Sequence, residues 1–171
     1  MAKMTSASAN KLLKKLQEDI EFWRKHESNS YLYTAAADEE PVIPEYDYAE
    51  VAATIAEIDD RMLKIKHAIN VANVNSRVLV GDTIMSVDTI LVKMAQLNKR
   101  KRILDVMRKQ LPKTRINSGM YSSRKTAPEY QYINYDLDLI KQEYERVDAE
   151  VTEMQIALDK HNQTFEFDVE Y

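Results

Sequence analysis

The sequence predicts a mainly α fold: an elongated antiparallel helical bundle, or coiled-coil hairpins, of four helices with short β elements at the ends. Three observations support this prediction. Apolar residues recur at alternating steps of three and four in four segments, which places them on one face of a helix. The 171 residues include only 2 glycines and 4 prolines, the residues that helix interiors tolerate least. Charged residues make up 30% of the chain and mix both signs, as on solvated helix faces.

We expect a single helical domain over residues 1–171. Its first helix covers about residues 6–29, where Ser6 or Ser8 can cap the start. The loop of residues 30–48 follows this helix. Its two prolines prevent a continuous helix, and it also contains an acidic run and four tyrosines.

The second predicted helix, about residues 49–75, has the most regular apolar face, with no step missed across about three heptads. The fourth predicted helix, about residues 136–161, has an apolar face of similar length. We expect these two faces to pack on each other or on a second copy of the chain. The predicted packing face consists of Val51, Ile55, Ile58, Met62, Ile65, Ile69, Leu137, Ile140, Tyr144, Val147, Val151, Met154 and Leu158.

The third predicted helix, about residues 84–111, carries Lys101 in a slot of its apolar face. A lysine in such a slot either specifies the register or partner, or extends past the edge of the core, and we favour the second arrangement. The loop of residues 112–128 is basic. Residues 129–135 and 164–170 alternate in polarity, which favours two short strands.

The connection between the second and third predicted helices concentrates amides and one of the 2 glycines. Residues 76–83 form the predicted loop, in which Gly81-Asp82 fits a tight hairpin turn. Asn73 and Asn75 fit the role of bonding free carbonyls at a helix end. We therefore interpret this stretch first as a corner. A buried polar network or a partner contact is the alternative, and its candidates are Asn70, Asn73 and Asn162.

Several short motifs follow one another along the chain. They are Glu39-Glu40-Pro41, Ile69-Asn70 with Asn73, Gly81 with Thr83-Ile84, Tyr121-Ser122-Ser123, Glu129 to Asn134, and Asn162-Gln163-Thr164-Phe165. In these motifs the chain resembles a largely uncharacterised family of small bacterial helical proteins, some of which are named septicolysin. The resemblance implies a helical fold with a glycine turn and a short strand. It implies no defined activity, although the name points to a cytolysin.

Catalytic and metal-binding patterns are missing from the sequence. Cysteine is absent, which excludes disulfides, thiolate nucleophiles and Cys-ligated metals. None of the 3 histidines follows a glutamate by three positions, as di-metal bundles require. His161 continues the apolar face of the last helix, which favours a core or helix-end role. Two glycines are too few for a glycine-rich dinucleotide loop, and no P-loop is present. We predict no catalytic residues, no metal, no cofactor and no enzymatic activity.

A cluster of cations supports the main alternative function. Basic side chains on the third predicted helix and in the loop after it could contact nucleic-acid phosphates. The candidates for this contact are Lys99, Arg100, Arg102, Arg115, Arg124 and Lys125. We favour the plainer interpretation, in which these cations pair with acids of the fourth helix. The net charge of −4 also gives no reason to expect nonspecific binding to nucleic acid.

The sequence therefore favours a non-enzymatic structural or protein-interaction module that self-assembles. Its expected partners are further copies of the chain, as a homo-oligomer, or another protein. Nucleic-acid association is the alternative, and a membrane-active, cytolysin-like protein is a less favoured third. No run of about 18 apolar residues predicts a membrane span. The N-terminal segment lacks the apolar core of a signal peptide, so we expect a cytoplasmic protein.

Overall fold

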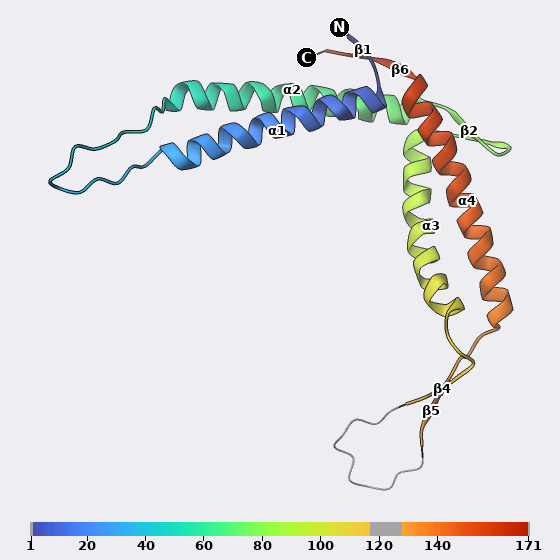
Figure 1. Ribbon diagram of the computed structural model, residues 1–171. Helices are drawn as coiled ribbons and strands as arrows, with labels where there is room; N and C mark the ends of the chain where they lie inside the picture. Colours follow the sequence, from blue (N-terminus) through green and yellow to red (C-terminus); the bar gives the residue numbers. More distant parts are fainter. Residues whose placement is uncertain (1, 117–127, 171) are drawn as a thin grey trace. The chain divides into compact units, whose positions relative to one another are not determined.

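The computed structural model describes residues 2–116 and 128–170 and confirms the mainly α fold with short β elements (Figure 1). The helices within these ranges are α1 Ser6–Ser30, α2 Tyr48–Asn75, α3 Val87–Arg108 and α4 Leu137–Thr164. The strands are β1 Ala2–Thr5, β2 Val78–Val80, β3 Thr83–Met85, β4 Lys113–Arg115, β5 Tyr130–Tyr132 and β6 Glu166–Val169. They form two-stranded pairs of β1 with β6, β2 with β3 and β4 with β5.

The four helices begin and end within a few residues of their predicted positions. Strands β5 and β6 also lie within the two segments predicted from alternation. Strand β1 and strand β4 are additions, since the sequence predicted no strand at the N-terminus and only a basic loop after α3. Both added strands are short, and each is defined by pairing with a distant segment rather than by its own pattern.

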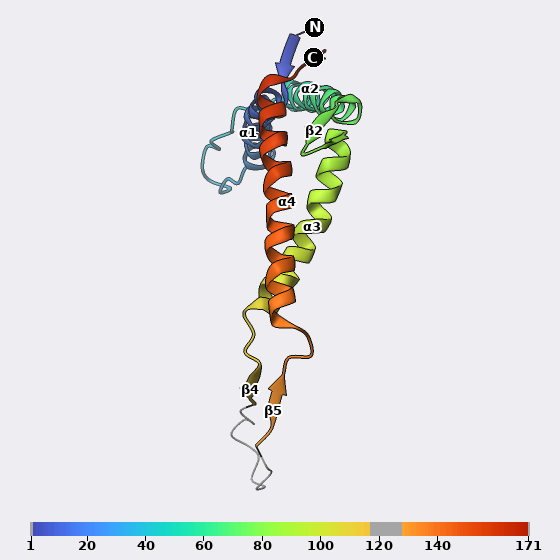
Figure 2. The ribbon, with the colours of Figure 1, turned by 90° about the vertical axis from the view of Figure 1, so that its right-hand side faces the viewer.

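Within the single domain that the sequence predicts, the chain forms two compact units. The first unit contains α1, α2 and the β1–β6 pair, and it consists of Met1–Val78, Ser86–Asp88 and Leu158–Tyr171. The second unit contains the β2–β3 turn, most of α3 and α4, and the β4–β5 pair, and it consists of Leu79–Met85 and Thr89–Ala157. Each unit is built around a helical hairpin: Figures 1 and 2 show α1 beside α2, and α3 beside α4.

Helix α1 begins with a reciprocal cap. The Thr5 hydroxyl accepts a hydrogen bond from the backbone N–H of Ser8 at 3.2 Å, and the Ser8 hydroxyl oxygen accepts one from the Thr5 N–H at 3.0 Å. Two backbone donors of the first turn are thereby satisfied. The N-cap is therefore Thr5, and the prediction of Ser6 or Ser8 as the cap is wrong. A cap needs extended backbone angles, which Thr5 adopts at the end of β1.

Helices α1 and α2 enclose the core of the first unit. Ile20 and Ile65 are at most 1% exposed, and Val169 of β6 closes the same core. The buried residues of this cluster are Ala9, Leu16, Ile20, Ile58, Met62, Ile65 and Val169. The face of α2 thus packs on α1, and the prediction that it packs on the fourth helix is wrong. Consecutive helices joined by a returning loop are the commoner neighbours.

Helices α3 and α4 each bury one stripe in the second unit. Ile90 and Leu104 of α3 are 0% exposed, and Val147 and Met154 of α4 are 1% exposed. Met94, Ile140 and Val151 are buried alongside them. Lys93 forms an ion pair with Glu150 at 2.6 Å, which links the two helices at the edge of these stripes.

A tight turn joins β2 to β3 through Gly81 and Asp82, as the sequence predicts. Gly81 has a φ of +54°, and no non-glycine residue of the described chain has a positive φ. Positive φ at the first central residue alone is typical of a type II′ turn, where glycine is preferred. A Cβ at position 81 would also lie 3.1 Å from Oε1 of Glu153.

Replacing Ile65 with alanine should lower the free energy of unfolding by about 2–5 kcal/mol, because it leaves a cavity in a closed core. Urea denaturation followed by circular dichroism measures this change. Leu63 on the same helix is 66% exposed, so Leu63→Ala is the matched control. We expect it to change the unfolding free energy by less than about 0.5 kcal/mol. Equal losses for the two variants would contradict the assigned core.

Replacing Gly81 with alanine should destabilise the fold by about 1–2 kcal/mol, because an L-residue is strained at positive φ. Thermal and urea unfolding measure the effect. Adding Glu153→Ala to the variant separates its two causes, since it removes the close contact and leaves the backbone strain. Most of the loss should persist in the double variant. Full recovery there would show that the side-chain contact, not the turn, requires glycine.

Candidate functional site

The predicted packing face is turned inward in both units. Nine of its residues are buried, and Ile55, Ile69, Leu137 and Tyr144 are half-buried. The buried ones are Val51, Ile58, Met62, Ile65, Ile140, Val147, Val151, Met154 and Leu158. Packing within the chain thus occupies this face. Contacts with another molecule must use other surfaces.

The asparagine-rich stretch forms the end of α2, as the interpretation of a corner predicts. Asn70 and Asn75 are exposed, and Asn73 is half-buried, as is Asn162 on α4. Other residues bond the last carbonyls of the helix: the Ser76 hydroxyl donates to the Ala72 oxygen at 2.6 Å. The Arg77 guanidinium donates to the oxygens of Val74, Asn75 and Ser76. Ser76 and Arg77 therefore bond carbonyls at the end of α2, which is the role predicted for Asn73 and Asn75.

Among residues 2–116 and 128–170, no group of three His, Asp or Glu side chains is placed to hold a metal ion. His161 is half-buried and stacks on Phe165, with 4.7 Å between ring centroids. Burial lowers the pKa of His161, so the neutral imidazole is favoured against the phenyl ring. No helix of the described chain is long and apolar enough to cross a membrane.

Lys93, Lys101 and Arg108 of α3 form ion pairs, and the first two of these pairs reach acids of α4. Lys101 forms an ion pair with Asp148 of α4. Asp105 lies 2.7 Å from the Arg108 guanidinium and also binds Lys109. These two cations hold the pKa of Asp105 below its usual range, Lys109 having the larger effect. The Asp148 carboxylate likewise raises the pKa of Lys101. These charges are neutralised within the chain.

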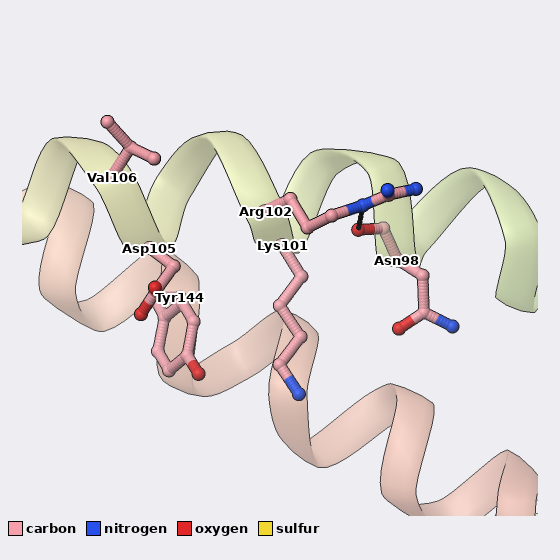
Figure 3. Close-up of a pocket in the computed structure, with 6 residues that line it drawn as sticks. All are labelled: Asn98, Lys101, Arg102, Asp105, Val106 and Tyr144. Atoms are coloured by element: carbon pink, nitrogen blue, oxygen red, sulfur yellow. Dashed lines mark hydrogen bonds between the residues drawn. The ribbon is translucent and has the colours of Figure 1, made fainter.

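An open hollow of about 700 Å³ lies along α3 and beside Tyr144 of α4. In Figure 3, Lys101 points from α3 toward α4, and Tyr144 faces Asp105 from the opposite helix. The Arg108 guanidinium lies 3.9 Å from the centre of the Tyr144 ring, at the distance of a cation–π contact. The hollow is lined by Asn98, Lys101, Arg102, Asp105, Val106 and Tyr144. Lys101 and Asp105 bind acidic or basic partners outside the lining, whereas Arg102 donates to the backbone oxygen of Asn98.

The candidate phosphate contacts divide into four groups. Lys99 and Arg102 are exposed, and no ion pair joins either to an acid within the described residues. Arg100 lies near Glu143. Both Arg146 and Arg100 lower the pKa of Glu143, and Arg146 has the larger effect. Arg115 is exposed on β4. Arg124 and Lys125 lie outside the described residues. Four of the six candidates thus lie in the described part of the chain, and all four are exposed.

The outer face of α3 combines exposed apolar residues with Lys99 and Arg102. Its large apolar side chains are between 43% and 59% exposed, and they are Leu91, Val92, Ile103 and Val106. None of these belongs to the predicted packing face. The sequence could have indicated this exposed face, because these residues lie off the regular apolar stripe of the helix, where polar residues are expected. This combination favours contact with another macromolecule.

Comparisons with known proteins bear on the fold. No protein-family model matches the sequence, and no curated protein matches it. A crystal structure of a functionally unknown conserved protein from Corynebacterium diphtheriae is similar, with a TM-score of 0.67 and 14% sequence identity. The similarity covers 98% of this chain and 100% of that one. It shows that the two proteins share a fold.

Proposed function

We propose that this protein is a non-enzymatic helical module that works by binding other proteins, in the first place further copies of itself. The supporting observation is the exposed apolar face of α3, where Leu91, Val92, Ile103 and Val106 are between 43% and 59% exposed. Exposed apolar side chains gathered on one helix face mark interaction sites.

Exposed apolar surface has two sources in the described chain. A two-helix hairpin buries one stripe per helix, so off-stripe apolar residues such as Val92 and Val106 remain outside, at 53% and 59% exposure. The second source is the connection between α1 and α2, where residues 31–43 are all exposed. Apolar surface of this extent on a small protein is characteristic of interaction sites. Self-association would cover it without needing any other component.

The protein should therefore have a solution mass that rises above 19.9 kDa with increasing concentration. Sedimentation velocity and light scattering over a dilution series measure the mass directly. Ile103→Lys combined with Val106→Lys should lower the mass if the outer face of α3 contributes to the contact. Lys66→Ala at an exposed position of α2 is the control. A mass equal to one chain at every soluble concentration would contradict self-assembly.

Nucleic-acid association is the second candidate, and the exposed Lys99, Arg102 and Arg115 favour it. Phosphate contacts would make binding strongly dependent on salt. Gel shifts with duplex DNA and with RNA, in a series that starts at low salt, provide the test. The combined Lys99→Glu and Arg102→Glu variant should reduce any shift on all sequences alike. Absence of a shift at about 50 mM salt would exclude this function.

A further inference from the structure

The connection between α1 and α2 is both acidic and apolar. We call residues 31–47 the acidic loop, because it contains five carboxylates and no lysine or arginine. Large apolar side chains accompany these charges, with Leu32 at 69% exposure and Val42 at 89%. Water solvates the carboxylates well, but it solvates the exposed apolar side chains beside them poorly. A surface with both properties suits a partner that supplies cations and aromatic rings together.

A pocket of about 400 Å³ lies where the acidic loop returns to the helices. Trp23 and His26 of α1 form one wall, and their rings meet edge to face with centroids 6.0 Å apart. Tyr46 of the loop stands beside His26, and its hydroxyl donates to Glu27 at 3.4 Å. Partial burial and the Glu27 carboxylate raise the pKa of Tyr46, so this hydroxyl remains a donor.

Carboxylates complete the rim of this pocket. Asp47 is occupied as the N-cap of α2, since its side chain accepts from the N–H groups of Ala49 and Glu50 at 2.8 and 3.1 Å. Glu45 and Glu50 also line the pocket, and both are exposed. Aromatic walls with carboxylates at the rim bind a guanidinium or ammonium group through cation–π contacts and charge-assisted hydrogen bonds.

The β4–β5 pair carries the complementary chemistry. We call residues 113–115 with residues 130–132 the basic arm, and all six are exposed. Lys113 pairs with Tyr132 and Arg115 pairs with Tyr130, so these four side chains share one face of the ribbon. The Lys113 ammonium lies 4.1 Å from the centre of the Tyr130 ring. A two-stranded ribbon with no covered face is marginally stable alone, and a partner that covers it would stabilise it.

We propose that the basic arm of one copy binds the acidic loop of a second copy, with Lys113 or Arg115 entering the pocket between Trp23, His26 and Tyr46. This inference rests on the proposed self-assembly and names its surfaces. Charge complementarity selects the second copy as the partner, because the acidic loop carries carboxylates and no lysine or arginine, and the basic arm carries two cations and no carboxylate. The chain already makes the same kind of contact internally, where Arg108 lies on Tyr144.

Charge reversal on each surface tests this docking by solution mass. The pocket variant is Glu45→Lys with Glu50→Lys, and the arm variant is Lys113→Glu with Arg115→Glu. Each variant alone should weaken association by about tenfold or more, because like charges then face each other. The contact should also weaken as salt rises, since exposed charges are screened beyond about 10 Å at 0.1 M ionic strength.

Rescue separates complementary charge from general damage. An equimolar mixture of the pocket and arm variants should regain the mass lost by each, since each supplies the surface that the other lacks. A single chain with all four reversals should also regain association. Glu57→Lys and Lys66→Glu on exposed positions of α2 are the matched controls and should behave as the native chain does. Circular dichroism verifies that every variant keeps its helix content.

The outcomes separate this docking from the proposed function. If the native chain assembles and both reversal variants have the same solution mass as the native chain, the docking is overturned. The proposal of self-assembly then remains in place. Failure of the mixture to regain mass would also overturn it. If the arm variant assembles normally but loses a nucleic-acid gel shift, the arm binds nucleic acid and the docking is overturned. A native chain that stays monomeric would overturn both proposals.

Discussion

Each long helix in this protein has one partner helix to cover its apolar stripe, and the other features follow from this constraint. A helix of 28 residues, such as α2, cannot bury its stripe against itself. Its face therefore packs along α1, where Ile65 is fully enclosed. Burying one such side chain stabilises the fold by about 1.5–3 kcal/mol, so the hairpin needs length to accumulate enough contacts. A third helix over each hairpin would bury more, but the described chain provides none within either unit.

The ends and edges of the hairpins are secured by polar contacts. Strand β6 pairs with β1 and inserts Val169 into the core between α1 and α2. In the other unit, the Tyr135 hydroxyl donates to the Met107 oxygen at 2.7 Å, which ties the start of α4 to the end of α3. Lys101 extends from a slot in the apolar stripe to reach Asp148. The side chains of Lys101 and Asp148 are 29% and 43% exposed, so this pair lies at the edge of the apolar stripe.

The helices were predictable because apolar residues recur many times at helical spacing within one segment, as they do from Val51 to Ile69. Which helix covers that stripe was not predictable, since periodicity identifies the buried face but not its partner. The ion pairs of Asp105 could be predicted from the spacing of residues in the sequence, because Arg108 and Lys109 follow Asp105 by three and four positions. The Lys101–Asp148 pair could not, since it depends on the register of α3 against α4. The pocket at the acidic loop was also missed, because Tyr46 reaches Trp23 and His26 only after the loop returns to α1.

The distribution of charge explains why self-association would use unlike surfaces. The apolar stripes are occupied inside the hairpins, and the remaining exposed apolar residues lie among charges: Arg102 and Asp105 near Val106, carboxylates near Val42. Two copies of the acidic loop would repel each other, as would two copies of the basic arm. Contact between the loop of one copy and the arm of another instead brings opposite charges together and covers apolar surface at the same time. Such a heterologous contact closes or extends according to the rotation between copies, and its specificity comes from the charges more than from the buried area.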